Sequence, residues 1–267
     1  MNQSITTRKN LPSDITSYDL LKAFAVVIMI IDHVGFYFFP DDLWWRAIGR
    51  IGFPVWFFLV GYARGRDIPT KLWGGALILM AANIVTGMYI FPLNALFTII
   101  AIRLLIDVVF KYGLKKQAYL WTIGVVLFLL VPPSYLLSEY GTQALITAMY
   151  GYCVRHKKEI GDDKLIFNFM IFAYVTFIII QQVSFAFSTE QFAFMAAGTL
   201  LVRMILFYFD SYSYPKLTKM MPTPGAWLIQ LCGRRTLEIY ILHLILFKFV
   251  ALYLGLEGYD WFNPEWV

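Results

Sequence analysis

The first long apolar stretch of the sequence, YDLLKAFAVVIMIIDHVGFYF (residues 18–38), contains four ionisable side chains: Asp19, Lys22, Asp32 and His33. Charged groups at membrane depth are energetically unfavourable, so they are usually paired or functional. His33 follows Lys22 by eleven positions. At about 100° per residue this spacing returns the two side chains to nearly the same helix face, with a rise of roughly 16 Å. It predicts a cation and an imidazole facing one common space at different depths.

An imidazole in this position can act as a general base, because it changes protonation near neutral pH and can accept the proton of an attacking hydroxyl or amine. We therefore predict His33 as the catalytic base. Asp32 lies about 100° around the helix from His33. We expect it to orient the site through an ion pair with Arg50, with Arg46 as the other possible partner. The alternative is that His33 is an ordinary interfacial residue at the end of a span.

Further cations occur within or beside later apolar runs. The predicted donor-binding residues are Lys22, Arg103, Arg203, Arg234 and His243, all placed by the expected topology in the cytoplasmic half of the membrane. Cations at similar depth on different helices must face the interior of a bundle, where they could bind an anion. Coenzyme A fits such a layout, since its nucleotide end is polyanionic and its long uncharged arm could reach His33.

A structural explanation remains open for single members of this set. Asp107 lies one helical turn after Arg103 and could neutralise it within the same helix. Arg64 and Arg66 are expected to be topology determinants in a solvated loop rather than donor-binding residues.

The composition indicates an integral membrane protein. Apolar residues make up 60% of the 267 residues and charged residues only 15%, against roughly 45–50% and about 25% in soluble domains. A spanning helix needs about 20 mostly apolar residues. Candidate runs lie near residues 19–39, 51–63, 72–91, 93–110, 118–137, 142–154, 165–184, 191–209 and 236–254. We predict an all-α fold, a polytopic helical bundle of about nine transmembrane helices, with residues 220–235 as a half-buried or interfacial segment.

The basic loops predict the orientation of the bundle. Lys and Arg gather in every second connection between the expected spans, so that these connections fall on one side of the membrane. The basic segments are residues 8–9, 63–71, 111–116, 155–159, 214–219 and 233–235. The positive-inside rule then places the N-terminus in the cytoplasm. Arg46 and Arg50 are exceptions to this rule, because the expected topology places them on the outer side. An ion pair with a carboxylate would explain their presence there.

Two stretches resemble the transmembrane acyltransferase-3 superfamily. The spacing Asp19-x-x-Lys22, with ten residues between Lys22 and His33, resembles the D-x-x-R-x(10)-H pattern of that superfamily's first helix, with Lys22 in place of the usual Arg. The stretch GRRTLEIYILH (233–243) is similar to a late stretch of the same superfamily, with Thr236, Tyr240 and His243 in matching positions.

A closer resemblance is to the TraX family, named after a conjugation-plasmid protein implicated in N-terminal acetylation of pilin. It rests on Asp32-His33 followed by GRIGFPVWFFLVGY (49–62). The resemblance implies an acyl-CoA-dependent transmembrane acyltransferase of the bacterial inner membrane, with acetyl-CoA as the donor substrate. We predict three segments: a cytoplasmic N-terminal segment (1–18), a transmembrane acyltransferase domain (19–255) and a short C-terminal tail (256–267).

Other readings stay open at this stage. The acceptor could be a pilin N-terminus, a surface glycan or a lipid-linked sugar, through O- or N-transfer, with or without a covalent acyl-enzyme. A transporter or flippase for an anionic solute or lipid is the alternative function. The net charge of +5 requires no nucleic acid partner. Cys153 and Cys232 show no metal-ligand spacing, so no metal is predicted.

Overall fold

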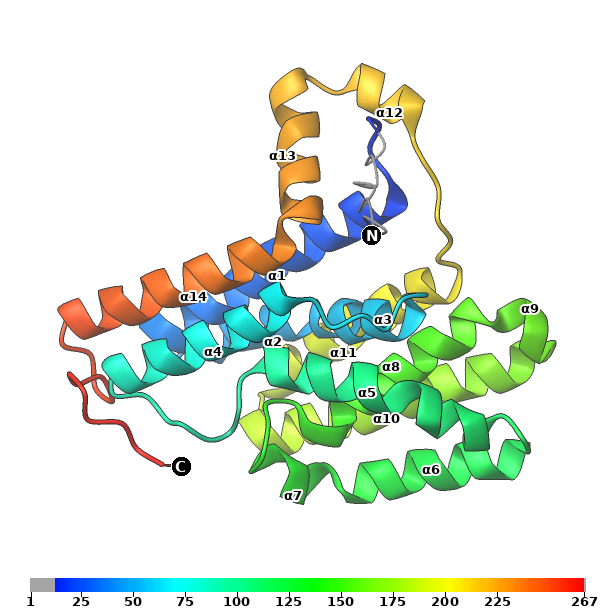
Figure 1. Cartoon of the computed structure of the whole chain (residues 1–267), viewed down its shortest axis with the longest axis horizontal. Coiled ribbons are helices and arrows are strands. Elements are labelled where there is room, and N and C mark those ends of the chain that lie inside the picture. The colour runs from blue at the N-terminus through cyan, green and yellow to red at the C-terminus, as the bar shows by residue number, and fades with distance from the viewer. Residues whose placement is uncertain (1–12, 267) are drawn as a thin grey trace, which may run out of the picture.

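The computed structural model describes residues 13–266, and these residues form helices joined by short loops (Figure 1). Within that range two isolated β-bridges occur and no strand. The helices are α1 (Ser17–Phe38), α2 (Leu43–Arg50), α3 (Phe53–Tyr62), α4 (Thr70–Val85), α5 (Ala95–Gly113), α6 (Gln117–Leu129), α7 (Val131–Tyr135), α8 (Gly141–Arg155), α9 (Lys157–Ile160), α10 (Asp163–Phe185), α11 (Thr189–Phe207), α12 (Pro215–Met220), α13 (Thr223–Arg234) and α14 (Thr236–Tyr253).

The predicted all-helical membrane class is confirmed. Each of the nine predicted runs contains a helix, and α1, α10, α11 and α14 are long and apolar enough to cross a membrane. The count of nine crossings remains a prediction. Helix α3 has only 10 residues, which at 1.5 Å each gives about 15 Å against a hydrocarbon core of about 30 Å. The run 118–137 is divided between α6 and α7, where two prolines follow Val131.

Capping side chains begin several of these helices. The Thr16 hydroxyl accepts the backbone N–H of Asp19 at 3.2 Å, and the Asp19 carboxylate accepts the backbone N–H of Thr16 at 3.0 Å. This reciprocal capping box starts α1. Ser188 and Gln191 form the same arrangement at the start of α11. Asn94 caps α5 by accepting the N–H of Leu96.

Arg46 and Arg50, which the sequence analysis placed on the outer side, lie on the short helix α2. This helix packs tightly against the second half of α1 through glycines. A side chain at Gly35 would collide with Trp45, and one at Gly49 would collide with Asp32. Because both glycines lack a Cβ, the two helix backbones approach closely and α2 presents its arginines to α1.

The buried core has two parts. The larger part joins α3 to α5, α6, α8, α10 and α11, and the smaller joins α4 and α14 to the end of α1 and the start of α5. Helix α3 packs closely against α8 at two glycines. Gly61 lies against the carbonyl of Ala148, and Gly151 lies against the carbonyl of Phe58. The space between the two cores is bordered by α1, α3, α5 and α14.

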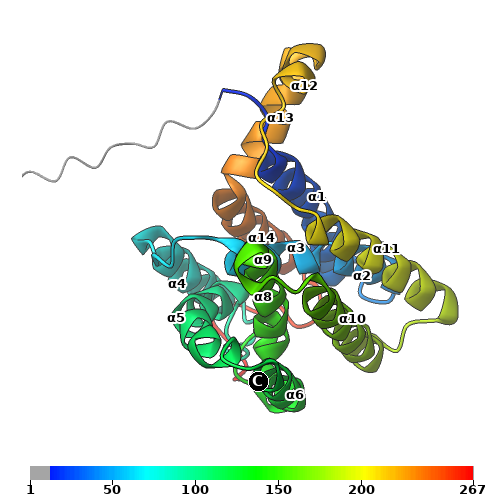
Figure 2. The ribbon, with the colours of Figure 1, turned by 90° about the vertical axis from the view of Figure 1, so that its right-hand side faces the viewer.

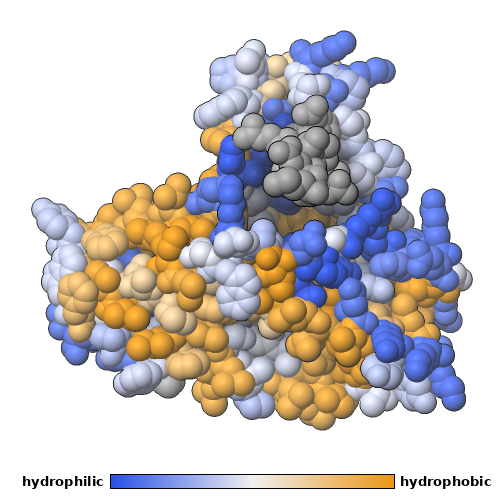
Figure 3. Space-filling view, in the orientation of Figure 1, coloured by the Kyte–Doolittle hydropathy of each residue, from blue (hydrophilic) through white to orange (hydrophobic). Residues whose placement is uncertain are grey.

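Helix α13 stands away from the other helices and packs beside the beginning of α1 (Figures 1 and 2). Its buried residues are Ala226 and Gly233, while Trp227 is 60% exposed. This fits the predicted interfacial segment. The surface is apolar over much of the helical body and hydrophilic over α12 and around α9 (Figure 3).

The two predicted terminal segments differ in what the structure describes. Most of the N-terminal segment 1–18, including its basic residues 8–9, lies outside the described residues. The tail folds back onto the loop after α4, where the N–H groups of Ile90 and Phe91 donate to the carbonyls of Glu265 and Trp266.

Candidate active site

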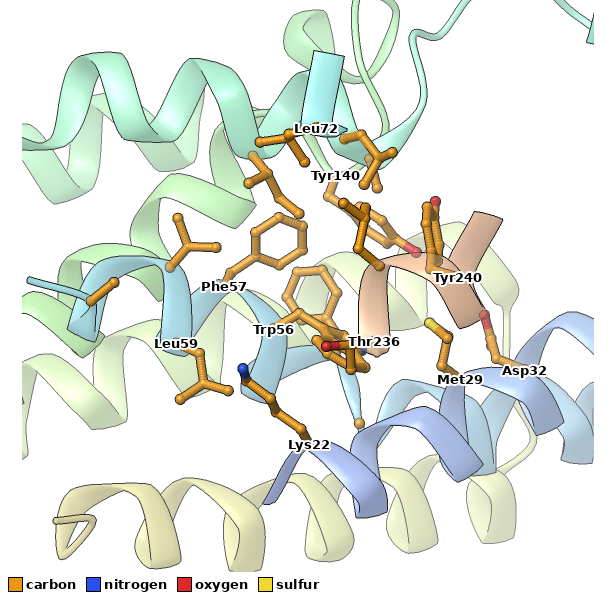
Figure 4. Close-up of a pocket in the computed structure, with 18 of the residues that line it drawn as sticks. Lys22, Met29, Asp32, Trp56, Phe57, Leu59, Leu72, Tyr140, Thr236 and Tyr240 are labelled. Atoms are coloured by element: carbon orange, nitrogen blue, oxygen red, sulfur yellow. The ribbon is translucent and has the colours of Figure 1, made fainter. Parts of the chain in front are cut away.

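A cavity of about 450 Å³ lies among α1, α2, α3, α5 and α14 (Figure 4). Lys22 and Arg103 line one end, which we call the basic end. His33 and Tyr240 line the other end, which we call the histidine end. Apolar side chains of α3, Trp56 and Phe57 among them, form the wall between (Figure 4). The cavity thus joins a cationic end to an imidazole on the same face of α1.

His33 is hydrogen-bonded to His243, with 2.8 Å between His33 Nδ1 and His243 Nε2. His243 Nδ1 lies 2.7 Å from the carbonyl oxygen of Ile239, one turn back in α14. A carbonyl only accepts, so His243 Nδ1 must carry the proton and donate. In the neutral pair, His243 Nε2 then accepts from His33 Nδ1–H. This leaves His33 Nε2 unprotonated, as a general base requires.

Asp32 is bound by both arginines of α2. Its Oδ2 lies 2.9 Å from Arg46 Nη1 and 2.8 Å from Arg50 Nη2, and Arg46 also donates to the Asp32 carbonyl at 3.0 Å. Asp32 is 5% exposed and Arg50 6%. Both guanidinium groups lie over the Phe185 ring, at 5.2 and 5.0 Å from its centroid. The predicted ion pair of Asp32 with Arg50 is therefore present, with Arg46 as a second cation.

The basic end contains two of the five predicted donor-binding residues. Arg103 donates through Nη1 to the carbonyl of Asp67 at 2.6 Å. The alternative partner, Asp107, is instead paired with Arg66 at 2.9 Å. Arg103 thus keeps its charge without an intrahelical carboxylate. Lys22 points into the cavity from α1 (Figure 4).

Arg234 and Arg203 do not line the cavity. The Arg234 guanidinium is already bound to Asp19, with Nη2 3.0 Å from Oδ2. Arg203 is fully buried among α8, α10 and α11, lies over the Phe177 ring at 5.7 Å, and has no hydrogen-bond partner for its guanidinium within the described residues. Sequence spacing placed both at a suitable depth but could not place them around the bundle.

His243 was assigned to the basic end from its position early in the last span, and that placement is wrong. Helix α13 packs against the first turns of α1, where Gly233 lies against Asp19. Helix α14 therefore begins alongside a later part of α1, and its residue 243 reaches the level of His33. The sequence analysis placed each residue by its distance from the start of its own span, and this does not reveal how far α14 is shifted along α1.

Sequence reasoning also missed polar residues near the histidine end. Lys248 is 5% exposed, and its Nζ contacts Met88 Sδ at 3.1 Å. Glu139 accepts the backbone N–H of Ala95 at 3.0 Å. Tyr140 lines the cavity (Figure 4), and the Arg50 guanidinium lies over its ring at 5.9 Å from the centroid. A lysine within the apolar run ILFKFVALY was a signal that could have identified Lys248.

The four long apolar helices are consistent with a multi-pass membrane protein, and its cavity brings several charged and polar side chains together between helices. The sequence pattern of the TraX protein family matches residues 17–251, and the chain belongs to this family. It is also 27% identical to the uncharacterized protein RP591 of Rickettsia prowazekii (strain Madrid E) over 251 residues, which cover 91% of this chain and 96% of the relative. No solved structure matches the chain.

Proposed function

We propose that this protein transfers an acetyl or other short acyl group from acyl-CoA to a hydroxyl or amine acceptor, with His33 as the general base. The observation that carries the proposal is the single cavity that has Lys22 and Arg103 at one end and His33 at the other. The rise of roughly 16 Å between Lys22 and His33 along α1 is comparable to the reach of an extended pantetheine arm.

The proposed reaction assigns each proton. His33 Nε2 accepts the proton of the acceptor hydroxyl or amine while the acceptor atom attacks the thioester carbonyl. The tetrahedral intermediate collapses, the carbon–sulfur bond breaks, and the CoA thiolate takes the proton back from His33. His243 holds His33 in the required tautomer through the 2.8 Å bond and shares the positive charge that forms on it.

Lys22 and Arg103 bind the anionic end of the donor in this proposal. Arginine and lysine form charge-assisted bonds to phosphate oxygens, which are stronger than neutral hydrogen bonds. Arg234 and Arg203 take no part in donor binding in this proposal. Arg234 is already paired with the Asp19 carboxylate, and Arg203 is buried in the packed interior of the bundle.

The proposed location is the bacterial inner membrane, with the N-terminus and the basic end of the cavity toward the cytoplasm, where acyl-CoA is made. The proposed acceptor binds at the histidine end and is a glycan, a lipid-linked sugar or a pilin N-terminus. None of these three is favoured by a specific contact in the cavity.

Acetyl-CoA labelled on the acetyl group tests the proposed function. Purified protein in detergent should hydrolyse the thioester slowly and should transfer the label when the right acceptor is added. Transport of an anion or lipid in proteoliposomes, with no thioester cleavage under any acceptor, would instead support the transporter alternative and overturn the acyltransferase proposal. Labelled protein formed without acceptor would indicate a covalent intermediate.

A further inference from the structure

A second pocket of about 160 Å³ lies beyond the C-terminal end of α3. It is formed by the loop after α3, a side chain of α5 and the end of α8. Its lining residues are Ala63, Arg64, Arg66, Asp107, Tyr152, Arg155 and His156. Three arginines face one carboxylate here, so the pocket is positively charged even when the imidazole is neutral. Such a pocket is suited to an anion.

The arginines of this pocket differ in their partners. Arg66 already has protein partners, since its Nε lies 2.9 Å from Asp107 Oδ1 and its Nη1 donates to the Ala63 carbonyl at 2.6 Å. Arg64 and Arg155 have no ion pair within residues 13–266, and Arg155 lies over the Tyr62 ring at 5.1 Å. A cation at the end of α8 also complements the helix dipole. That explains Arg155 but not Arg64, which comes from a different element.

The second pocket adjoins the first cavity. Ala63 lines both, and Arg103 of the first cavity donates to the Asp67 carbonyl in the loop that separates them. Helix α3 extends for 10 residues from Phe53, which lines the first cavity, to Tyr62 beside Arg155. That is about 15 Å. A ligand with its reactive group at His33 and an uncharged arm along α3 would bring its far end to Arg64 and Arg155.

We propose that the second pocket binds the 3′-phosphate of coenzyme A through Arg64 and Arg155, with the diphosphate at Lys22 and Arg103. This inference rests on the proposed function and adds the specificity for the phosphorylated ribose. Guanidinium groups from two elements can grip the oxygens of one phosphate from two sides. The volume suits a phosphate group on a ribose. The adenine would lie outside the pocket.

Comparison of CoA with dephospho-CoA, which lacks only the 3′-phosphate, tests this assignment. Binding of each to purified protein is measured by calorimetry for the wild type, Arg64→Gln and Arg155→Gln. The matched control is Arg235→Gln, which changes an exposed arginine paired with Glu238 at 3.3 Å. The wild type should bind CoA about 10- to 100-fold more tightly than dephospho-CoA, as expected for a charge-assisted contact. Each pocket variant should lose most of this preference without changing dephospho-CoA affinity.

The outcomes separate this proposal from the proposed function. Equal wild-type affinity for the two compounds, or equal weakening of both by Arg155→Gln, would overturn the 3′-phosphate assignment and leave donor binding standing. Failure of the wild type to bind either compound would overturn the proposed function itself. Binding of phosphatidylglycerol nanodiscs that falls in Arg64→Gln while CoA affinity does not would identify a lipid headgroup as the anion and overturn the proposal.

Discussion

His33 and His243, 210 positions apart in the sequence, share one hydrogen bond of 2.8 Å between α1 and α14. The chain from the Ile239 carbonyl through His243 to His33 fixes where each proton lies. It leaves one nitrogen, His33 Nε2, as the basic atom at the end of the cavity. In the proposed reaction, His243 therefore positions His33 and does not contact the donor.

Replacement of His243 should lower the transfer rate while leaving donor affinity intact. His243→Ala removes the acceptor of the His33 Nδ1 proton. We expect kcat to fall by about 10- to 100-fold, less than the roughly 10²–10⁴-fold loss expected when the base itself is removed, because His33 is still present. His243→Gln can place a carbonyl oxygen near the former Nε2 and should recover part of the rate. The measurement is kcat and KM for acetyl-CoA.

A structural effect of the same substitution would look different. Leu242→Ala, at a neighbouring side chain that is 66% exposed, is the matched control and should retain wild-type kinetics. Identical kinetics for His243→Ala and His243→Gln, or a rise in KM for acetyl-CoA in either, would contradict the positioning role.

The ion pairs of Asp32 predict that replacing Asp32 destabilises the protein more than replacing Arg50. Asp32→Asn leaves the buried Arg50 and the half-buried Arg46 without their carboxylate and should lower the free energy of unfolding by about 3–5 kcal/mol. Arg50→Gln leaves Asp32 still paired with Arg46 at 2.9 Å and should be milder. The double variant should lose less than the sum of the two, because the contacts are shared. Strictly additive losses in detergent unfolding curves would disprove the coupling.

Gly49 should be intolerant of a methyl group. An added Cβ would collide with the Asp32 side chain, so Gly49→Ala must displace the carboxylate or separate α2 from α1. We expect a loss of about 1–3 kcal/mol in unfolding free energy, typical of overpacking, together with reduced transfer. Gly74→Ala is the control, since an added Cβ there meets nothing within 4 Å. Equal stability of the two alanine variants would argue against the close contact.

Much of the architecture could be predicted because apolar runs of about 20 residues are a strong signal. Helix α2 was missed because its sequence, LWWRAIGR, is not an apolar run. Its close packing against α1 depends on Gly35 as well as on its own Gly49, and Gly35 lies in a different helix, outside the local pattern of α2.

The candidate site was predictable where one helix carries it and less so where several do. Lys22 and His33 lie on one helix, so their spacing alone placed them on one face of the cavity. Arg203 and Arg234 required the rotation of other helices around the bundle, which spacing does not give. His243 required the offset between α1 and α14.

The residues predicted to bind the donor differ in whether they line the cavity. Lys22→Gln and Arg103→Gln should each raise the Kd for CoA by about 10-fold or more, the effect of losing one charge-assisted contact. Arg234→Gln should instead leave the Kd near the wild-type value and reduce stability, because its guanidinium binds Asp19 at 3.0 Å. Binding isotherms that show the reverse order would assign the anion to the α13 side of α1.

The central claim is tested most directly by measuring CoA binding and acyl transfer on one preparation of His33→Ala. The proposed donor contact Lys22 lies roughly 16 Å along α1 from His33, so the variant should bind CoA with wild-type affinity. Loss of the base should lower transfer by about 10²–10⁴-fold. Val27→Ala, at an exposed position of the same helix, should bind and transfer normally. Transfer by His33→Ala at the wild-type rate would contradict the account.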